Sequence, residues 1–572
     1  MADQFMPPDA PGIAPGGPGR GEELVLLPLG GIGEIGMNCY LYGLGPRDAR
    51  QWLMVDLGLT FPEGENDPGV DVILPDLRYI EAERGNLAGI LLTHAHEDHF
   101  GAVIELWPRL KVPIYATPFT AALLRAKVAE YGKRRELPIR EVALGSRFSI
   151  GLFDLELVEM AHSIPESNAV VIRTPLGTVL HTGDWKLDPT PVVGTGTAPQ
   201  RLAEIAGGVT ALVCDSTNAM REGRSPSEAD VARTLGEIIA NAKRRVVVTI
   251  FASNVARIRA VWEAANAAGR RLVVAGRAMH RVIDVAMATG YLPQDFDYDD
   301  QTRFPHLAAS EVVALCTGSQ GEPRAAMARI AADEHPDIEL DRGDLVIFSS
   351  RTIPGNERTV GRIQNRLVDI GCEVITDNEA LVHVTGHPRR DELREMYAAI
   401  RPRLAVPMHG ESRHLEAHRK LARDAGVKKV VSIRNGEMAR LAPDPAEIVD
   451  QAPVGRLFRD GRLLIAAEDS PVRERRSLGY AGIVVVALAR PGKGNVSPDA
   501  EIVLDGVPQL DGEGRSMLDI VRRTIEGTLR SIPRDRQRDG EMVREAVRRA
   551  VRNAVDDAWG KRPVVKVLLT RG

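Results

Sequence analysis

The sequence predicts an α/β protein: a β-rich sandwich that is interrupted by an inserted α/β domain and followed by a small C-terminal α/β domain. Two observations carry this prediction. Histidine and aspartate residues follow several strand-like apolar runs, and the long interval between Asp184 and His409 alternates strand-like runs with helical patterns. At 572 residues the chain has room for roughly two to four domains.

The composition is that of an ordinary globular protein, with 44 % hydrophobic and 26 % charged residues. The net charge of −5 by itself gives no support for a nucleic-acid partner. No apolar run reaches the length needed to cross a bilayer, and the Pro- and Gly-rich residues 1–20 predict a disordered tail rather than a signal peptide. The four cysteines are far apart and form no C-x-x-C pair, which predicts a reduced, cytoplasmic protein.

The first strand-like run leads into "LPLGGIGEIGMN", residues 27–38, which contains the G-x-G-x-x-G pattern of dinucleotide-binding proteins. Asp56 even lies about 20 positions further on, where a ribose-binding carboxylate is expected. The pattern binds a nucleotide only when a helix begins at its last glycine. Here "MNCYLYGLGP" predicts a short strand and "QWLMVDLG" another, so the sequence argues against a dehydrogenase.

The strongest chemical motif lies in "LAGILLTHAHEDHFGAV", where an apolar run ends just before a cluster of histidines. In an extended segment residues two apart point the same way, so His94 and His96 can bind one ion together. A turn then directs Asp98 and His99 toward a second ion, as a helix begins at "FGAVIELW". Imidazole and carboxylate ligands without thiolate suit zinc or manganese. The alternative, a polar loop with exposed histidines, is disfavoured by the density of the motif.

Three further candidate ligands also follow strand-like runs: His162 in "VEMAHSIPES", Asp184 in "TVLHTGDWKLD" and His409 in "LAVPMHGE". Strands of a sandwich present such residues at one shared edge. Each residue taken alone is more often a packed or surface residue. His181 falls within a strand pattern, and we predict that it is structural.

The pattern H-x-H-x-D-H followed by His162, Asp184 and His409 resembles the metallo-β-lactamase fold. This resemblance implies an αββα sandwich in which the glycine stretch belongs to the first hairpin. It also implies that Asp56 braces the metal-binding loop from behind its ligands. We expect two divalent ions per subunit, zinc in preference to manganese, with one bound by His94, His96 and His162, the other by Asp98, His99 and His409, and Asp184 bridging both.

The interval after Asp184 resembles the β-CASP domain of metallo-β-lactamase enzymes that act on nucleic acids. The matching residues are Asp215 in "LVCDSTNA", His383 and His387 in "VHVTGHP", and His409. The stretches "LGGIGEIGMN", "FASN", "CTGSQGEP" and "HVTGHPRRDEL" further resemble the bacterial ribonuclease J family, from about Glu22 to about Gly436. Thr385 stands where that family is expected to have serine, and the hydroxyl group is kept.

The resemblance implies a metal-dependent ribonuclease that acts in RNA maturation and decay. It implies two-metal hydrolysis of phosphodiesters from the 5′ end, a preference for a 5′ monophosphate, and additional internal cuts. Asp98, Asp184 and His387 are the expected catalytic residues, and His387 is the candidate acid for the leaving oxygen, with phosphate binding as the competing role. Asp215 is expected behind the ligands. The expected substrate-binding residues are His383, Thr385, Gly386, His387, Ser253, Asn254 and Ser319.

The predicted domain boundaries follow from these patterns. They are a disordered tail over 1–20, the first part of the metallo-β-lactamase domain over 21–210, the β-CASP domain over 211–365, the second part of the first domain over 366–450, a linker over 451–477 and a C-terminal α/β domain over 478–572. The last domain resembles the one that ribonuclease J uses for self-association. The arginines of its helices are explained at least as well by a solvated face as by contact with RNA.

The expected partners are single-stranded RNA, a second or further copy of the chain as a homodimer or homotetramer, and proteins of an RNA-degradation complex, with no membrane. Two alternative functions stay open at the level of sequence. One is another hydrolase of the same fold that acts on small esters or lactams, and the other is an inactive RNA-binding subunit. The complete ligand set argues against the second.

Overall fold

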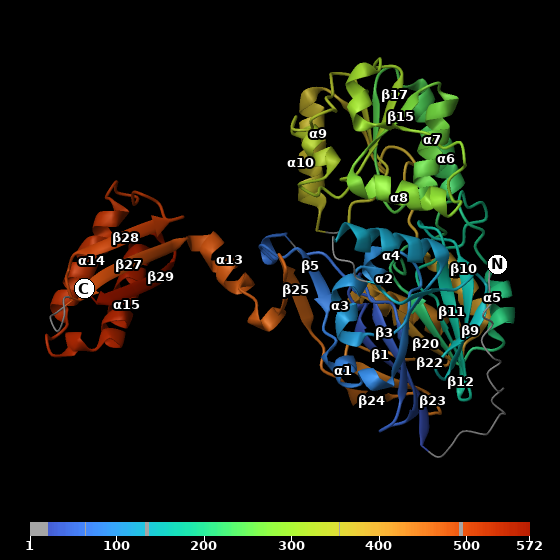
Figure 1. The fold of residues 1–572 in the computed structure, drawn as a ribbon, viewed down its shortest axis with the longest axis horizontal. Helices are drawn as coiled ribbons and strands as arrows, with labels where there is room; N and C mark the ends of the chain where they lie inside the picture. Colours follow the sequence, from blue (N-terminus) through green and yellow to red (C-terminus); the bar gives the residue numbers. More distant parts are fainter. Residues whose placement is uncertain (1–20, 63, 132–135, 354, 491–495, 572) are drawn as a thin grey trace, which may run out of the picture. The chain divides into compact units, whose positions relative to one another are not determined.

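The computed structural model describes residues 21–62, 64–131, 136–353, 355–490 and 496–571 (Figure 1). The tail predicted over residues 1–20 lies outside them. The described residues form two compact units: Phe61–Val72 with the residues from Phe458 onward, and the rest of the chain up to Leu457. In the described part, no helix is both long and apolar enough to cross a membrane. The cysteines Cys39, Cys214, Cys316 and Cys372 are free and buried.

The larger unit contains the predicted sandwich of two mixed sheets. The first has the order β24-β23-β1-β3-β4-β6-β7-β8, and the second the order β22-β20-β13-β12-β11-β10-β9. The strands of the first sheet are β1 (Glu22–Gly30), β3 (Cys39–Pro46), β4 (Gln51–Val55), β6 (Leu87–Leu91), β7 (Ile114–Ala116), β8 (Ile139–Glu141), β23 (Glu437–Ala442) and β24 (Ile448–Gln451). Those of the second are β9 (Arg147–Ile150), β10 (Phe153–Met160), β11 (Ser167–Thr174), β12 (Gly177–His181), β13 (Ala211–Asp215), β20 (Leu404–Met408) and β22 (Lys429–Val430).

The apolar side chains of alternate strand positions fill the space between the two sheets. Leu53 and Val55 of β4, for example, share this core with Leu155 and Leu157 of β10. The outer face of the second sheet is covered by three helices, α5 (Pro199–Ala206), α11 (Arg390–Ile400) and α12 (Ser412–Asp424). Outside the first sheet lie α1 (Arg78–Ala82) and α3 (Val103–Leu110), so the layers are αββα (Figure 1). The predicted fold class is confirmed, and β3 follows the glycine stretch where a dinucleotide site would need a helix.

The insertion is a parallel α/β domain whose six strands have the order β16-β15-β17-β14-β18-β19. Helices α9 and α10 lie on one side of this sheet and α6 and α7 on the other (Figure 1). The strands are β14 (Val246–Thr249), β15 (Arg271–Ala275), β16 (Asp299–Asp300), β17 (Val312–Cys316), β18 (Leu345–Phe348) and β19 (Glu373–Ile375). The helices are α6 (Glu228–Asn241), α7 (Val255–Ala267), α8 (Arg277–Ala288), α9 (Ala326–Ala331) and α10 (Glu357–Ile370).

Sheet membership differs slightly from the proposed domain limits. β13 belongs to the sandwich because it pairs in parallel with β12 and β20, although the β-CASP domain was predicted to begin at 211. β19 belongs to the inserted sheet because it pairs with β18, although that domain was predicted to end at 365. Both strands are short apolar runs, and only pairing with distant strands decides which sheet each one joins.

The second unit contains the C-terminal domain. Its sheet has the order β28-β27-β29, formed by β28 (Ala500–Asp505), β27 (Ile483–Arg490) and β29 (Val564–Arg571). Helices α14 (Met517–Ser531) and α15 (Gly540–Trp559) cover one face through valine and leucine side chains. The segment 451–477, predicted as a linker, contains β25 (Arg456–Asp460), β26 (Leu463–Ala466) and the start of α13 (Val472–Ala481).

Candidate metal centre

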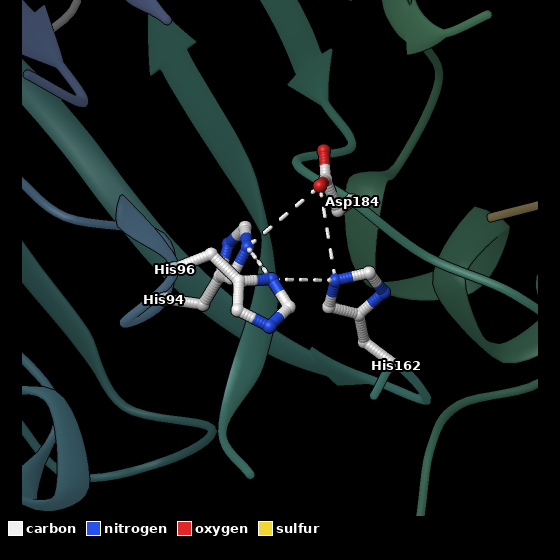
Figure 2. Close-up of side chains that lie close together, drawn as sticks. All are labelled: His94, His96, His162 and Asp184. Carbon is white, nitrogen blue, oxygen red and sulfur yellow. Dashed lines mark hydrogen bonds and ion pairs between the residues drawn. The ribbon is translucent and has the colours of Figure 1, made fainter. Parts of the chain in front are cut away.

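Four predicted ligands converge from three strand ends (Figure 2). His94 and His96 follow β6, His162 follows β10, and Asp184 follows β12. His96 Nδ1 lies 3.2 Å from His94 Nε2 and 3.0 Å from His162 Nε2. Asp184 Oδ2 lies 3.8 Å from His94 Nε2 and 3.7 Å from His162 Nε2. The three imidazoles and the carboxylate therefore surround one point.

Hydrogen bonds behind these histidines orient two of the rings. The Thr93 hydroxyl donates to Asp56 Oδ2 at 2.9 Å, so its oxygen accepts from His94 Nδ1, also at 2.9 Å. His162 Nδ1 lies 2.6 Å from the carbonyl oxygen of Gly386, which can only accept, so Nδ1 carries the proton. In both rings Nε2 is left as the atom with a free lone pair, and it faces the common point.

A second group, Asp98, His99, Asp184 and His409, shares Asp184 with the first. His99 Nε2 lies 3.2 Å from Asp184 Oδ2 and 3.6 Å from Asp98 Oδ2. His409 Nε2 lies 3.2 Å from Asp98 Oδ2. Asp56 accepts from His99 Nδ1 at 2.7 Å, so one buried carboxylate braces His99 directly and His94 through Thr93. Asp56 thus lies behind two of the candidate ligands.

A third group adds Asp215 and His387 to Asp184 and His409. His387 Nδ1 lies 2.8 Å from Asp215 Oδ2 and 3.8 Å from Asp184 Oδ2. Asp215 Oδ1 accepts from the Thr217 amide at 2.8 Å, which fixes the carboxylate. His387 thus stands at the border of the cluster with its second ring nitrogen not used by Asp215.

The glycine stretch supports His409 from behind. His409 has a left-handed backbone, with φ of 50°, and its amide donates to the Gly31 carbonyl oxygen at 2.8 Å. A Cβ atom at Gly31 would lie 2.3 Å from the Tyr40 hydroxyl oxygen and 2.4 Å from Asn38 Oδ1. Ile32 and Gly33 then form a short parallel pair with Gly410 and Glu411. The Tyr40 and Asn38 side chains packed against Gly31, together with its left-handed φ of 84°, explain the need for glycine at position 31.

Burial and charge divide the histidines into two kinds. Burial lowers the pKa of His94 and His162 well below the ordinary range and that of His96 to about 4, so these rings are neutral. Burial also acts to lower the pKa of His99 and His409, but the neighbouring carboxylates, Asp184 foremost, outweigh it and raise both well above the ordinary value. The pKa of Asp184 is correspondingly held far down by His409, His99 and His387, although burial opposes this.

The donor set fits divalent metal ions. The Nε2 atoms of His94 and His162 both face Nδ1 of His96, at 3.2 and 3.0 Å, and a divalent cation among the three nitrogens would accept all their lone pairs. The carboxylates supply negative charge, and Asp184 belongs to all three groups, as a bridging ligand would. His181 lies outside these groups; its Nδ1 lies 2.9 Å from the Tyr42 hydroxyl oxygen.

Some of the predicted substrate-binding residues lie next to the ligands, and others lie in the inserted domain. Thr385 Oγ1 accepts from Asn218 Nδ2 at 2.8 Å and from the His387 amide at 3.2 Å, next to the centre. Gly386 has no room for a side chain, because a Cβ atom would lie 2.4 Å from the His162 ring. The Nδ1 atom of His383 is buried and has no hydrogen-bond partner in the described part of the chain.

Ser253, Asn254 and Ser319 lie in the inserted domain, where they follow the adjacent strands β14 and β17. Ligands of parallel sheets commonly bind at such carboxyl ends. The carboxamide oxygen of Asn254 is already engaged, since it caps α7 by accepting from the Arg257 amide at 2.9 Å. Arg257 Nη1 in turn donates to the Val382 carbonyl at 2.7 Å, which joins the start of α7 to the segment that contains His383.

Two residues near the ligands were not predicted from the sequence. Thr93 connects Asp56 to His94, and its position directly before the histidine motif could have indicated this. Asn38 Nδ2 lies 3.1 Å from His99 Nε2 and donates to the Asp98 carbonyl at 3.1 Å. Asn38 is far from the motif in sequence, so no local signal could have identified it.

The αββα sandwich with joined His/Asp groups at its strand ends defines a metal-dependent hydrolase. Four family models match: "Metallo-beta-lactamase superfamily" over residues 32–207, "Ribonuclease J, beta-CASP domain" over 243–367, "Zn-dependent metallo-hydrolase RNA specificity domain" over 371–432 and "Ribonuclease J C-terminal domain" over 471–572. Among solved structures, a protein of unknown function from Enterococcus faecalis aligns with a TM-score of 0.51 at 17 % identity, covering 73 % of this chain and 99 % of the other.

Curated relatives extend over nearly the whole chain. A ribonuclease J of Sinorhizobium meliloti is 50 % identical over 96 % of this chain and 98 % of its own length. A ribonuclease J of Mycolicibacterium smegmatis is 38 % identical over 94 % and 93 %, and ribonuclease J2 of Bacillus subtilis 35 % over 82 % and 84 %. The chain therefore belongs to the ribonuclease J family. It is a metal-dependent ribonuclease, and RNA is its substrate.

Proposed function

We propose that this ribonuclease degrades RNA from the 5′ end toward the 3′ end, prefers a 5′ monophosphate, and also cuts internally during RNA maturation and decay. The observation that carries the proposal is the position of the segment His383–His387 beside the ligands. Its Gly386 carbonyl accepts from the ligand His162, and its His387 joins the group around Asp184. End recognition and hydrolysis would thus take place side by side.

The cofactor in this proposal is two divalent ions per subunit, zinc in preference to manganese. His94, His96 and His162 would hold one ion, Asp98, His99 and His409 the other, and Asp184 would bridge them. Such a pair activates water and stabilises the charge that develops on a phosphodiester. The chain's own residues then have to orient the RNA, keep the ligand rings in the right tautomer and supply a proton to the leaving group.

His387 is suited to supply that proton. Burial acts to lower the pKa of His387, but Asp215 and Asp184 outweigh it and raise the pKa above the ordinary value. With Nδ1 turned to Asp215, a protonated ring would have its Nε2 hydrogen free to donate to the departing 3′ oxygen. The product would be a downstream fragment that begins with a 5′ phosphate, and hence a substrate for the next cycle.

The 5′ phosphate would be bound by the loops at the carboxyl ends of β14 and β17 together with His383 and Thr385. The start of α7, a helix of 13 residues, offers a favourable dipole, and Nδ1 of His383, which has no partner in the described part of the chain, would donate to the phosphate when the ring is protonated. Ser253 and Ser319 would add hydroxyl groups. A pocket of this kind binds a monophosphate and excludes a bulkier triphosphate.

The test uses 3′-labelled RNA that carries either a 5′ monophosphate or a 5′ triphosphate, incubated with the full chain and zinc or manganese. We expect the monophosphate RNA to be degraded to mononucleotides and the triphosphate RNA to be degraded far more slowly. An Asp98→Ala variant should leave both intact. Equal rates on the two RNAs would contradict the end preference, and products that shorten from the 3′ end would contradict the direction.

We further propose that the enzyme acts in the cytoplasm as a homodimer or homotetramer associated through its C-terminal domain. The C-terminal family model supports this proposal, and the mixed sheet of that domain has one face covered by α14 and α15. Partners in an RNA-degradation complex would dock on such an assembly. Light scattering of the full chain, compared with a chain ending before Val472, measures whether the domain determines the oligomeric state.

A further inference from the structure

Three consecutive residues, Glu166, Ser167 and Asn168, connect the candidate metal centre to the rest of the larger unit. They follow the loop that contains His162. The Ser167 hydroxyl donates to the carbonyl oxygen of Asp184 at 2.7 Å. Asn168 Nδ2 donates to the carbonyl oxygen of Thr93 at 3.1 Å, directly before His94. This short segment therefore bonds to the backbone of Asp184 and to the residue before His94, and it follows the loop of His162 in the chain.

Glu166 holds this segment in place from two sides. Its Oε2 accepts from the Phe119 amide, in the first turn of α4 (Pro118–Glu130), at 2.8 Å. Its Oε1 accepts from the Tyr291 hydroxyl at 2.9 Å. Glu166 is only 4 % exposed and has a left-handed backbone, with φ of 59°. A residue other than glycine keeps such a backbone only when its contacts determine it.

Tyr291 comes from a different domain than its partner. It follows α8 of the inserted domain, and its amide donates to the Ala286 carbonyl at 2.8 Å, which fixes it to the end of that helix. Its ring meets Phe119 edge to face, with centroids 5.7 Å apart. The hydroxyl therefore reaches Glu166 from a well-defined position and links the inserted domain to the loop of His162.

We propose that Tyr291 is a positioning residue for the metal centre: through Glu166 it fixes the segment 162–168, and thereby His162 and the backbone of Asp184. The inserted domain then contributes to metal affinity as well as to RNA binding. Residues that orient ligands in this way affect affinity although they never touch the ion. The inference rests on the metal centre proposed above.

The experiment compares the full-length chain with its Tyr291→Phe variant, which keeps the ring and removes only the hydroxyl. Zinc affinity is measured by competition with a coloured chelator, and folding is checked by circular dichroism. Ligand-orienting partners typically change metal affinity about 10- to 100-fold, and Tyr291 acts one contact further away, so we expect zinc to bind about 3- to 10-fold more weakly. The kcat on RNA should fall at limiting zinc and recover at excess zinc, with an unchanged KM.

Arg281→Gln is the matched control. Arg281 of α8 pairs with Glu130 of α4, so this variant loosens the same contact between domains without touching Glu166. Its zinc affinity should equal that of the unchanged chain. If both variants weaken zinc binding equally, the effect belongs to the domain contact in general and the inference about Tyr291 is wrong.

A Glu166→Ala variant tests the route of the effect, because it removes both carboxylate oxygens that accept from Phe119 and Tyr291. If Tyr291 acts through Glu166, removal of the Tyr291 hydroxyl should add nothing in the Glu166→Ala background. If the losses of zinc affinity in the two single variants multiply in the double variant, the inference is wrong. It is also wrong if the Tyr291→Phe variant has normal zinc affinity and a raised KM for RNA. Failure of the unchanged chain to bind zinc would instead refute the proposed metal centre, so the two failures are distinguishable.

Discussion

The Nδ1 atom of His387 lies 2.8 Å from Oδ2 of Asp215, and the two residues stand far apart in the sequence. Asp215 ends β13 of the sandwich, whereas His387 lies between β19 of the inserted domain and α11. This pair is therefore formed where the two domains meet, beside the ligand Asp184. Both the orientation and the protonation of His387 depend on it.

Replacement of His387 by alanine should lower the single-turnover rate about 10²- to 10⁴-fold, the range for a lost general acid, while RNA binding is largely kept. In an RNA with sulfur in place of the leaving 3′ oxygen, the leaving group needs no proton. The unchanged chain and the His387→Ala variant should therefore cleave this RNA at nearly equal rates. Loss of RNA binding with a normal rate would show that His387 only holds phosphate.

Asp184→Asn should abolish activity and lower the metal content, because Asp184 is the one residue shared by all three ligand groups. Metal bound per chain is measured by mass spectrometry after dialysis. Glu97→Gln is the control: Glu97 lies within the histidine motif, but its carboxylate pairs with Lys127 Nζ at 2.6 Å. Treatment with a chelator should inactivate the unchanged chain, and added zinc or manganese should restore it. Full metal content in Asp184→Asn would contradict the bridging role.

Gly386→Ala should disturb the metal centre, since the new Cβ atom would lie 2.4 Å from Cε1 and Nδ1 of the His162 ring. We expect weaker metal binding and loss of most activity. Gly236→Ala provides the comparison, because a Cβ atom there, in the middle of α6, meets nothing within 4 Å. That variant should be at least as stable as the unchanged chain, by up to about 1 kcal/mol. Equal activity of the two variants would show that the His162 ring has room to move.

Unfolding at acid pH should depend on His418, which is buried between the Ser216 and Tyr397 hydroxyl groups. Burial lowers the pKa of His418 to about 4, whereas in the unfolded chain it is about 6.5. Between pH 6.5 and 4 the unfolded chain therefore binds a proton at His418 that the folded chain does not bind. Neutral His418 contributes fully to the free energy of unfolding above pH 6.5, and this contribution is lost as the pH falls toward 4, by about 3 kcal/mol at most.

His418→Leu should be less stable at neutral pH, because it leaves two buried hydroxyl groups without their partner. Its free energy of unfolding should decline less steeply than that of the unchanged chain between pH 6.5 and 4. Urea titrations at several pH values measure both slopes. Parallel declines in the two proteins would rule out His418 as a source of the pH dependence.

Local patterns were sufficient for several of the elements. The apolar run in "LAGILLTHAHEDHFGAV" predicted β6, and the alternation of strand-like runs with helical patterns after Asp184 predicted the inserted α/β domain. They were insufficient for sheet membership: β13 and β19 are short apolar strands whose sheets depend on distant partners. They were equally insufficient for the predicted linker, where β25 and β26 form at positions without a strong periodic signal.

The sequence by itself determined the kinds of ligand and their approximate grouping, because histidines and aspartates that directly follow strands can only meet at the sheet edge. Only the tertiary structure decided how each ring is oriented, since this depends on contacts between residues remote in sequence, such as His162 with Gly386 and His409 with Gly31. It also revealed Asn38 beside His99, and Glu166 between α4 and Tyr291. Such contacts form only when separate strands and domains pack together, and no spacing within one segment records them.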